Sequence, residues 1–409
     1  MVENLKKNWS NYFQIYVLTL IFFGVFFLYS KHDIGNDSSL SGWLINYEGG
    51  FVRRGLIGEL ITNFSTFLSF KLRDSILMFQ ISFFISYYLL IILFCKNLFQ
   101  NRLIILAIFS PIFVLYPVAE IEVLGRKELI VFTIFLSYLF FDIKDLKVQF
   151  IYKMILFPIG ILTWEPVFLF FSFLLLIDIF VFQVKNFDKK FYYIVLSYLV
   201  SIFIVVLIYL NPFSQENYIA MSDFLKNQFG EKCYMSCHYV GNQSSNSFSE
   251  FYKDFLNKFK FSYALRYFLI VLVGFFPLCL ITIYSKVTSK KDDLIISKFK
   301  NLFYPFLLAF LPSTVLYLVM YDWGRVVHIS YTFSLVTFLY LVKENFIEIS
   351  NQKVQANYIS KVSNKIFIVV FFLFAFAWNP KVVMVDDVAS KPIYDTPYKF
   401  YKYFIRDKF

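Results

Sequence analysis

The stretch from 46 to 59 combines charged residues with glycines in an otherwise apolar and aromatic chain, and it reads N-Y-E-G-G-F-V-R-R-G-L-I-G-E. It holds two adjacent arginines, Arg53 and Arg54. A guanidinium is a planar fork that binds phosphate through two hydrogen bonds, and it is costly beside a bilayer unless an anion meets it. The N–H groups of Gly49 and Gly50 could approach the same anion because no side chain shields them. The segment is therefore predicted to bind phosphate.

Two further arginines stand in short polar breaks between apolar runs. Arg126 lies in A-E-I-E-V-L-G-R-K-E, and Arg325 lies in Y-D-W-G-R-V-V-H. Together with Arg53 and Arg54 they would suit a pyrophosphate. The alternative is that these arginines pair with nearby carboxylates or lipid headgroups and only fix loops, with Lys127 and Glu128 flanking a helix start. The nearby carboxylates are Glu48, Glu59 and Glu122.

Four side chains are candidates for acid–base chemistry. Glu48 lies beside the glycines and arginines of the first motif. Glu165, between two apolar runs, is either a proton-transfer group or the partner of a buried arginine. Asp322 is either an acid or the cap of a following helix. His328 could act as a general base near neutral pH, or it could be a hydrogen-bonded structural residue.

The cysteines suggest a disulfide rather than a metal centre. Cys233 and Cys237 lie in a loop that is expected to face an oxidising compartment, which favours a local disulfide. The motif C-Y-M-S-C-H could also offer three ligands to zinc, His238 included, but a fourth ligand is missing. We predict no metal and no cofactor. The chain carries no P-loop or Rossmann glycine pattern, so a soluble nucleotide is not expected as the energy source.

The elements that must position these residues are membrane helices. Hydrophobic residues make up 59% of the 409 positions, and the mean hydropathy is +0.63. Long continuous apolar runs predict an all-α polytopic membrane protein of about 10–12 spans in one domain, residues 1–409. The expected spans are 13–30, 75–95, a third that ends near 118, 129–141, 191–211, 263–285, 302–320, a short one after 328, and 366–378. Segments 154–164 and 167–182 are each short for a crossing and form either two tilted spans that meet at Glu165 or a re-entrant pair.

The lysine distribution predicts the orientation. Loops 1–12, 96–102, 142–153, 183–190, 286–301 and 343–365 are dense in lysine and are expected inside. Segments 31–74 and 212–262 are then periplasmic, and residues 56–70 lie at the interface as an amphipathic helix. All four catalytic candidates and the four arginines above fall on the outer side. The net charge of +11 is spread over many loops, which favours anionic lipid over nucleic acid as its partner.

The motifs E-G-G-F-V-R-R-G-L-I-G, L-G-R-K-E, T-W-E-P and D-W-G-R resemble those of bacterial O-antigen polymerases, over residues 46 to 328. The resemblance implies a bacterial inner-membrane enzyme of lipopolysaccharide assembly. It would join oligosaccharide repeat units carried on undecaprenyl pyrophosphate at the periplasmic face without metal. A chain-length regulator is an expected partner. Many such polymerases have their arginine motifs in the later half, whereas here the densest one comes early.

That departure leaves a second resemblance open, to membrane glycosyltransferases of the GT-C type. These use a polyprenyl-phosphate sugar, often with a divalent metal, and usually carry a catalytic acid in the first outer loop. Glu48, Asp33 and Asp37 are the candidates for that acid. A third reading, from another class, is a flippase or transporter for a lipid-linked glycan. The absence of a visible inverted repeat in the sequence counts against it.

Overall fold

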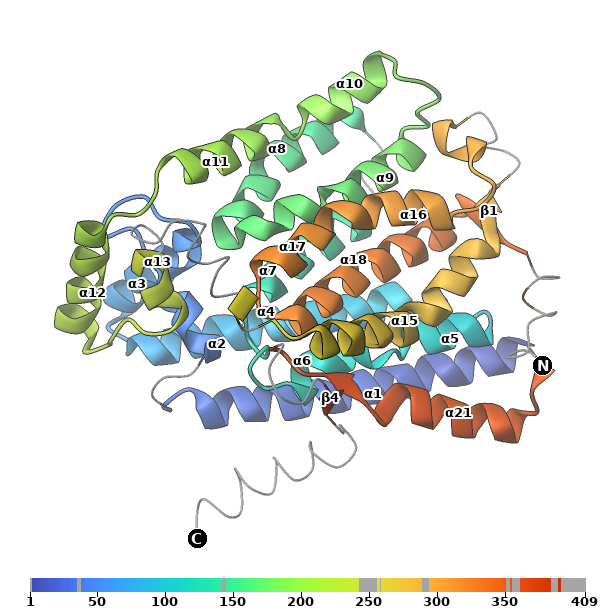
Figure 1. Ribbon diagram of the computed structural model, residues 1–409, viewed down its shortest axis with the longest axis horizontal. Helices are drawn as coiled ribbons and strands as arrows, with labels where there is room; N and C mark the ends of the chain where they lie inside the picture. The colour runs from blue at the N-terminus through green and yellow to red at the C-terminus, as the bar shows by residue number, and fades with distance from the viewer. Residues whose placement is uncertain are drawn as a thin grey trace, which may run out of the picture.

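The computed structural model describes residues 2–34, 38–141, 145–242, 256–257, 259–288, 294–350, 354, 361–383 and 389–390. In this part of the chain the structure is almost entirely helical (Figure 1). Two short antiparallel strand pairs complete it. Strand β1 (Ser285–Val287) pairs with β2 (Ile347–Ile349), and β3 (Asn379–Pro380) pairs with β4 (Ala389–Ser390). The chain is an all-α, multi-pass membrane protein.

The helices follow one another with few long connections. Those of the first half are α1 (Val2–Lys31), α2 (Ser38–Ser41), η1 (Gly42–Leu44), α3 (Gly55–Leu68), α4 (Leu72–Cys95), α5 (Arg102–Ile108), η2 (Pro111–Leu115), α6 (Tyr116–Ala119), α7 (Glu128–Phe140), α8 (Leu146–Thr163), η3 (Glu165–Phe170) and α9 (Phe171–Val181). Those of the second half are α10 (Lys189–Leu196), α11 (Leu199–Leu210), α12 (Gln215–Phe229), α13 (Ser236–Asn242), α15 (Phe261–Ile283), η5 (Ile295–Lys298), α16 (Phe303–Phe310), η6 (Leu311–Val315), α17 (Leu316–Val319), α18 (Trp323–Lys343) and α21 (Asn364–Phe376).

Six helical segments within the described residues are long and apolar enough to cross a membrane, or seven if the bent pair α10–α11 is one span. Three shorter apolar helices, which include α7 and α21, bring the apolar segments close to the number expected from the sequence. Prolines shape the third span. Pro111 opens a π-helical segment between α5 and α6, because proline cannot donate the backbone hydrogen bond of a regular helix.

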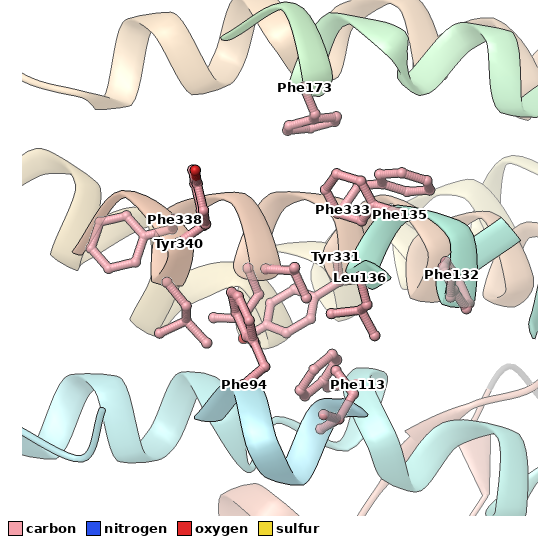
Figure 2. Close-up of a cluster of buried hydrophobic side chains, with 14 of the residues drawn as sticks. Phe94, Phe113, Phe132, Phe135, Leu136, Phe173, Tyr331, Phe333, Phe338 and Tyr340 are labelled. Carbon is pink, nitrogen blue, oxygen red and sulfur yellow. The ribbon is translucent and has the colours of Figure 1, made fainter. Parts of the chain in front are cut away.

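Helix α18 forms the centre of the bundle. Between Trp323 and Val342 every residue is buried. Phe333 lies 4.7 Å from Phe135 between ring centroids, and Figure 2 shows both rings with Tyr331 in the core. Phe333 also stacks on Phe170 with ring centroids 4.8 Å apart, and Tyr331 contacts Phe275 at 4.9 Å. The sequence predicted a short span that starts after residue 328. The helix begins at Trp323 instead, and it has no amphipathic pattern to mark its start because neighbours cover all its faces.

The segments 31–74 and 212–242 pack on each other at one end of the bundle, where Figure 1 shows α3, α12 and α13 together. A separate buried cluster joins them, with Trp43, Ile57 and Met221 among its members. Arg73 fastens the two segments by donating to both carboxylate oxygens of Glu231, at 2.6 and 2.9 Å. Residues 56–70 were predicted as an amphipathic helix at the membrane interface, and the structure confirms a helix with one buried face, α3. Its place at the interface stays a prediction.

Candidate anion-binding site

Three helices begin at nearly the same place. The first turns of α3, α7 and α18 meet the break between α8 and η3, where Trp164 and Glu165 lie. The unpaired N–H groups and the dipole of a helix N-terminus favour negative charge. The motifs that the sequence analysis singled out therefore meet at one point, although they are far apart along the chain.

Glu165 is the anchor of the first arginine pair. Arg54 donates to its carboxylate from Nε at 2.6 Å and from Nη2 at 2.7 Å, and Arg53 donates from Nη1 at 3.3 Å. Burial acts to raise the pKa of Glu165, but the charges of Arg54 and Arg53 outweigh it and lower that pKa to about 2. Glu165 is therefore the ionised partner of the arginines. As a permanently ionised carboxylate it cannot serve as a general acid at neutral pH.

Arg54 is held by its backbone as well as by its side chain. Its φ is +64°, in the left-handed region that residues with a Cβ seldom adopt. Its carbonyl accepts a hydrogen bond from Nζ of Lys127 at 2.6 Å. Burial, followed by the charge of Arg54, lowers the pKa of Lys127 to about 7, and Glu165 and Glu128 offset this only in part.

A second charged group surrounds Arg325. Its Nη2 donates to Oε1 of Glu128, and its Nη1 donates to Oδ2 of Asp322 at 2.7 Å. Asp322 also lies 3.5 Å from Nη1 of Arg126, whose Nε donates to the Glu122 carbonyl at 2.7 Å. Arg325 and Glu128 are each only 5% exposed. Asp322 occupies the N-cap position of α18 but makes no side-chain capping bond, so its role is to hold the arginines.

The two groups face one pocket, which we call the anion pocket. Its space, including the open mouth, is about 360 Å³. The lining residues are Ser39, Gly42, Trp43, Arg54, Arg126, Lys127, Glu128, Trp164, Ser236 and Arg325. Four of these side chains are basic, and Glu128 is the one acidic residue among them. Such a lining attracts an anion.

Two buried N–H donors in the anion pocket have no partner. Nε of Arg325 and Nε1 of Trp164 are both enclosed, and neither makes a hydrogen bond within the described part of the chain. A buried donor without an acceptor costs about 1–3 kcal/mol, so such groups are rare and often mark the place of a ligand or a water molecule. Arg325 also lies over the Trp164 ring, 5.8 Å from its centroid. Both residues therefore have unused capacity to bind an acceptor.

His328 lines a small adjoining inner cavity, with room for about one water molecule, which shares Arg126, Glu128 and Arg325 with the anion pocket. Its side chain is 1% exposed, and its Nδ1 lies 2.9 Å from the Ile112 carbonyl. Since only a protonated nitrogen can donate to a carbonyl, Nδ1 carries the hydrogen and Nε2 is the acceptor. The sequence placed Asp322 and His328 in one outer turn. They lie instead on the first two turns of α18, and His328 faces the interior.

Three predicted residues lie away from the anion pocket. Glu48 is exposed on the turn after Asn46. The N–H of Gly50 donates to the Tyr47 carbonyl at 2.8 Å, which closes that turn. A Cβ on Gly49 would come 1.9 Å from the Asn217 carbonyl oxygen, so this glycine allows α12 to approach. The glycines serve packing in this structure. Asp33 is exposed, and Asp37 lies outside the described residues.

Sequence reasoning proposed three of the lining residues, Arg54, Arg126 and Arg325, and did not propose the other seven, among them Lys127, Glu128 and Trp164. Lys127 and Glu128 were read as flanks of a helix start, which they are, but the loop before α7 buries them. That loop is fixed by Gly125, whose φ is +73° and whose carbonyl accepts Nε1 of Trp43 at 2.8 Å and Nε2 of Gln80 at 3.0 Å. The sequence feature that could have identified Lys127 and Glu128 is the motif L-G-R-K-E itself, a charged run in an unusually short break between apolar segments.

The cysteine loop borders the anion pocket. Cys233 and Cys237 form a disulfide, and Ser236 between them is a lining residue. Both thiols are consumed by this bond, so the alternative of a zinc site with His238 is wrong. His238 instead contacts the Tyr218 hydroxyl through Nδ1 at 2.9 Å. Within the described ranges no three His, Cys, Asp or Glu side chains are grouped so that they could hold a metal ion.

Comparisons with family models, with curated proteins and with solved structures give no match for this chain.

Proposed function

We propose that the protein is a membrane-embedded glycosyltransferase that polymerises oligosaccharide units carried on a polyprenyl pyrophosphate. The observation that carries the proposal is the anion pocket. It combines Arg54, Arg126, Lys127 and Arg325 with the two unpaired donors of Arg325 and Trp164, beside apolar helices. A diphosphate attached to a lipid is an anion that reaches such a place through the bilayer.

The arginines would stabilise the leaving group. When the sugar is transferred, the bond between its anomeric carbon and the phosphate oxygen breaks, and negative charge develops on the pyrophosphate. Preorganised donors at that point lower the barrier because they need no rearrangement. Arg54 and Arg325 are held in place for this by Glu165, Glu128 and Asp322. Lys127 adds a further positive charge when it is protonated.

We assign Glu128 as the general base that takes the proton of the acceptor hydroxyl. It is the carboxylate in the lining of both the anion pocket and the inner cavity. In the proposed step the acceptor hydroxyl gives its proton to Glu128, its oxygen bonds to the anomeric carbon, and the polyprenyl pyrophosphate leaves toward the arginines. Both carboxylate oxygens of Glu165 accept hydrogen bonds from Arg53 and Arg54. By contrast, Arg325 contacts Glu128 through Oε1 alone within the described residues, so Glu128 keeps one oxygen for the acceptor. Neither Glu165 nor Glu48 lines the anion pocket.

The lysine-dense loops support an orientation in which the anion pocket faces the outer side of the membrane. The bacterial inner membrane and its periplasmic face enter the proposal through the resemblance of the motifs. A lipid-linked donor carries its own leaving group, so it can react on a face that has no nucleotide supply. A chain-length regulator is the expected protein partner, and the arrangement proposed here needs no cofactor.

The experiment is the surface-glycan ladder of a deletion strain that carries variants of the gene. The wild-type gene is expected to restore long glycan chains. Arg54→Ala and Glu128→Gln are expected to give single repeat units on the lipid core, with normal amounts of protein in the membrane. Long chains with either variant would overturn the proposal. Repeat units that accumulate undelivered on the cytoplasmic leaflet would show transport instead of polymerisation.

A further inference from the structure

One wall of the anion pocket contains a covalent cross-link. Cys233 and Cys237 form a disulfide, and Ser236, which lies between them in the chain, lines the pocket. The side chain of Cys237 is 0% exposed and belongs to the same buried cluster as Trp43, which is also a lining residue. The disulfide therefore joins a lining residue to the cluster that packs beside the pocket.

The backbone inside this loop has an uncommon conformation. Met235, which precedes Ser236, has a φ of +44°, in the left-handed region that residues with a Cβ seldom adopt. Its side chain is 44% exposed, so side-chain packing contributes little to holding it there. Such a conformation persists only where the surrounding structure enforces it. The disulfide closes the chain on both sides of Met235 and supplies this constraint.

The ends of the cysteine loop are anchored separately from its middle. Glu231, before the loop, accepts two hydrogen bonds from α4, and Nδ1 of His238, after it, lies 2.9 Å from the Tyr218 hydroxyl. Between these anchors the N–H of Ser236 donates to Oγ of Ser41 on α2 at 3.4 Å, which is long for a hydrogen bond. The position of Ser236 at the pocket wall therefore depends on the disulfide.

We propose that the Cys233–Cys237 disulfide is a redox control of the anion pocket. The oxidised loop holds Ser236 at the wall, and reduction releases the wall and weakens anion binding. This inference rests on the proposed function, because it assigns a regulation to the same pocket. The loop is expected to face an oxidising compartment, where the cross-link persists until a dithiol reduces it.

The chemical step is a thiol–disulfide exchange, with a dithiol as the reductant. Cys233 is half-buried and Cys237 is fully buried, so the incoming thiolate attacks Sγ of Cys233. Sγ of Cys237 leaves with the electron pair of the broken bond and takes up a proton. The second thiol of the dithiol then displaces Sγ of Cys233 from the mixed disulfide. The protein gains two electrons and two protons, and the dithiol loses them as it becomes a disulfide.

The test measures equilibrium binding of inorganic pyrophosphate to the protein in nanodiscs, before and after reduction with dithiothreitol. We expect reduction to weaken binding about tenfold, the size of one lost hydrogen bond, and reoxidation to restore it. Cys233→Ser combined with Cys237→Ser should bind like reduced wild type and should not respond to dithiothreitol. Cys279→Ser is the matched control, because it removes a free thiol outside the loop and should respond as wild type does.

A second measurement separates redox control from a purely structural role. Coupling between two sites is reciprocal, so a tenfold preference of pyrophosphate for the oxidised protein should lower the midpoint potential of the disulfide by about 30 mV when pyrophosphate is saturating. A structural disulfide would change the free energy of unfolding, but neither this potential nor the affinity of the folded protein.

Equal pyrophosphate affinity of oxidised and reduced wild type overturns the inference, while the proposed function stands. A loss of affinity that reoxidation does not restore also overturns it, since this would report unfolding. If the double variant does not fold, the oxidised and reduced forms of wild type still give the comparison. Oxidised wild type that fails to bind pyrophosphate overturns the proposed function itself.

Discussion

The guanidinium of Arg54 donates two hydrogen bonds to the carboxylate of Glu165, which lies 111 residues further along the chain. This contact joins the start of α3 to the break between α8 and η3. It also fixes the orientation of the Arg54 side chain, while the Arg54 carbonyl accepts a hydrogen bond from Nζ of Lys127. An arginine whose charge is already balanced can adjoin apolar helices at a modest cost, and it can still contact a second anion.

Glu165→Gln should lower both stability and activity. The substitution removes the charge that holds two arginines, so we expect the free energy of unfolding to fall by about 1–3 kcal/mol. Long glycan chains should be lost because Arg54 is no longer oriented. Glu48→Gln is the matched control, since that carboxylate is exposed on a turn outside the anion pocket. Denaturation in detergent and the glycan ladder measure the two effects, and equal behaviour of the two variants would contradict the account.

The same pair predicts a dependence of stability on acid. The pKa of Glu165 is lowered from 4.5 to about 2 in the folded protein. A carboxylate with a depressed folded-state pKa contributes its full stability above about pH 4.5, and this contribution is lost as the pH falls toward 2. Wild type should therefore lose stability more steeply than Glu165→Gln between pH 4.5 and pH 2. Parallel curves for the two proteins would show that the pair is unimportant.

Lys127 predicts a pH dependence of anion binding. Its pKa of about 7 means that it loses its proton near neutrality, so pyrophosphate affinity should fall as the pH rises from 6 to 8. Lys127→Arg should bind without this pH dependence. Lys127→Met should bind weakly at every pH. It should also be more stable than wild type below pH 7, because the cost of burying a charged lysine is largest there. An unchanged pH profile in Lys127→Met would exclude Lys127 as the titrating group.

Trp164→Phe should separate binding from stability. The indole N–H is buried without a partner, so its removal should leave the free energy of unfolding unchanged or slightly higher. A hydrogen bond to a charged acceptor contributes about 1.5–3 kcal/mol, so pyrophosphate affinity should fall by about 10- to 100-fold. Binding titrations and denaturation on the same preparation measure both quantities. Unchanged affinity would show that this donor does not reach the ligand.

Much of the fold could be predicted from the sequence, because long apolar runs leave few alternatives to helices. The exact starts of helices were harder to predict. The polar run around Arg325 looked like a loop, yet it is the first turn of α18, since the charges are balanced by Glu128 and Asp322 from within the bundle. A residue pattern does not reveal a partner that lies far away in the chain.

For the candidate site, too, the sequence indicated the unusual residues but not their partners. Three of the four arginines that were predicted to cluster, Arg54, Arg126 and Arg325, line one pocket, and their chemistry is uncommon in an apolar chain. Arg53 contacts Glu165 but is not among the lining residues. Which carboxylate pairs with which arginine depends on tertiary packing, and so Glu165 was read as either a catalyst or a partner. Trp164 could not be singled out at all. Its importance lies in an N–H that finds no acceptor, and only the folded structure shows that.

The central claim is that the anion pocket binds a diphosphate, and Gly42 offers the most direct measurement. It lines the pocket, and a Cβ at this position would meet nothing within 4 Å. Gly42→Phe should therefore fill the pocket without disturbing its neighbours. Equilibrium binding of pyrophosphate in nanodiscs is the measurement. Gly160→Phe is the control of equal size, because Gly160 does not line the pocket and a Cβ there would meet only Val167, at 3.9 Å. We predict saturable binding to wild type and to Gly160→Phe, and none to Gly42→Phe. Binding to Gly42→Phe equal to that of wild type, or no binding to wild type, would contradict the claim.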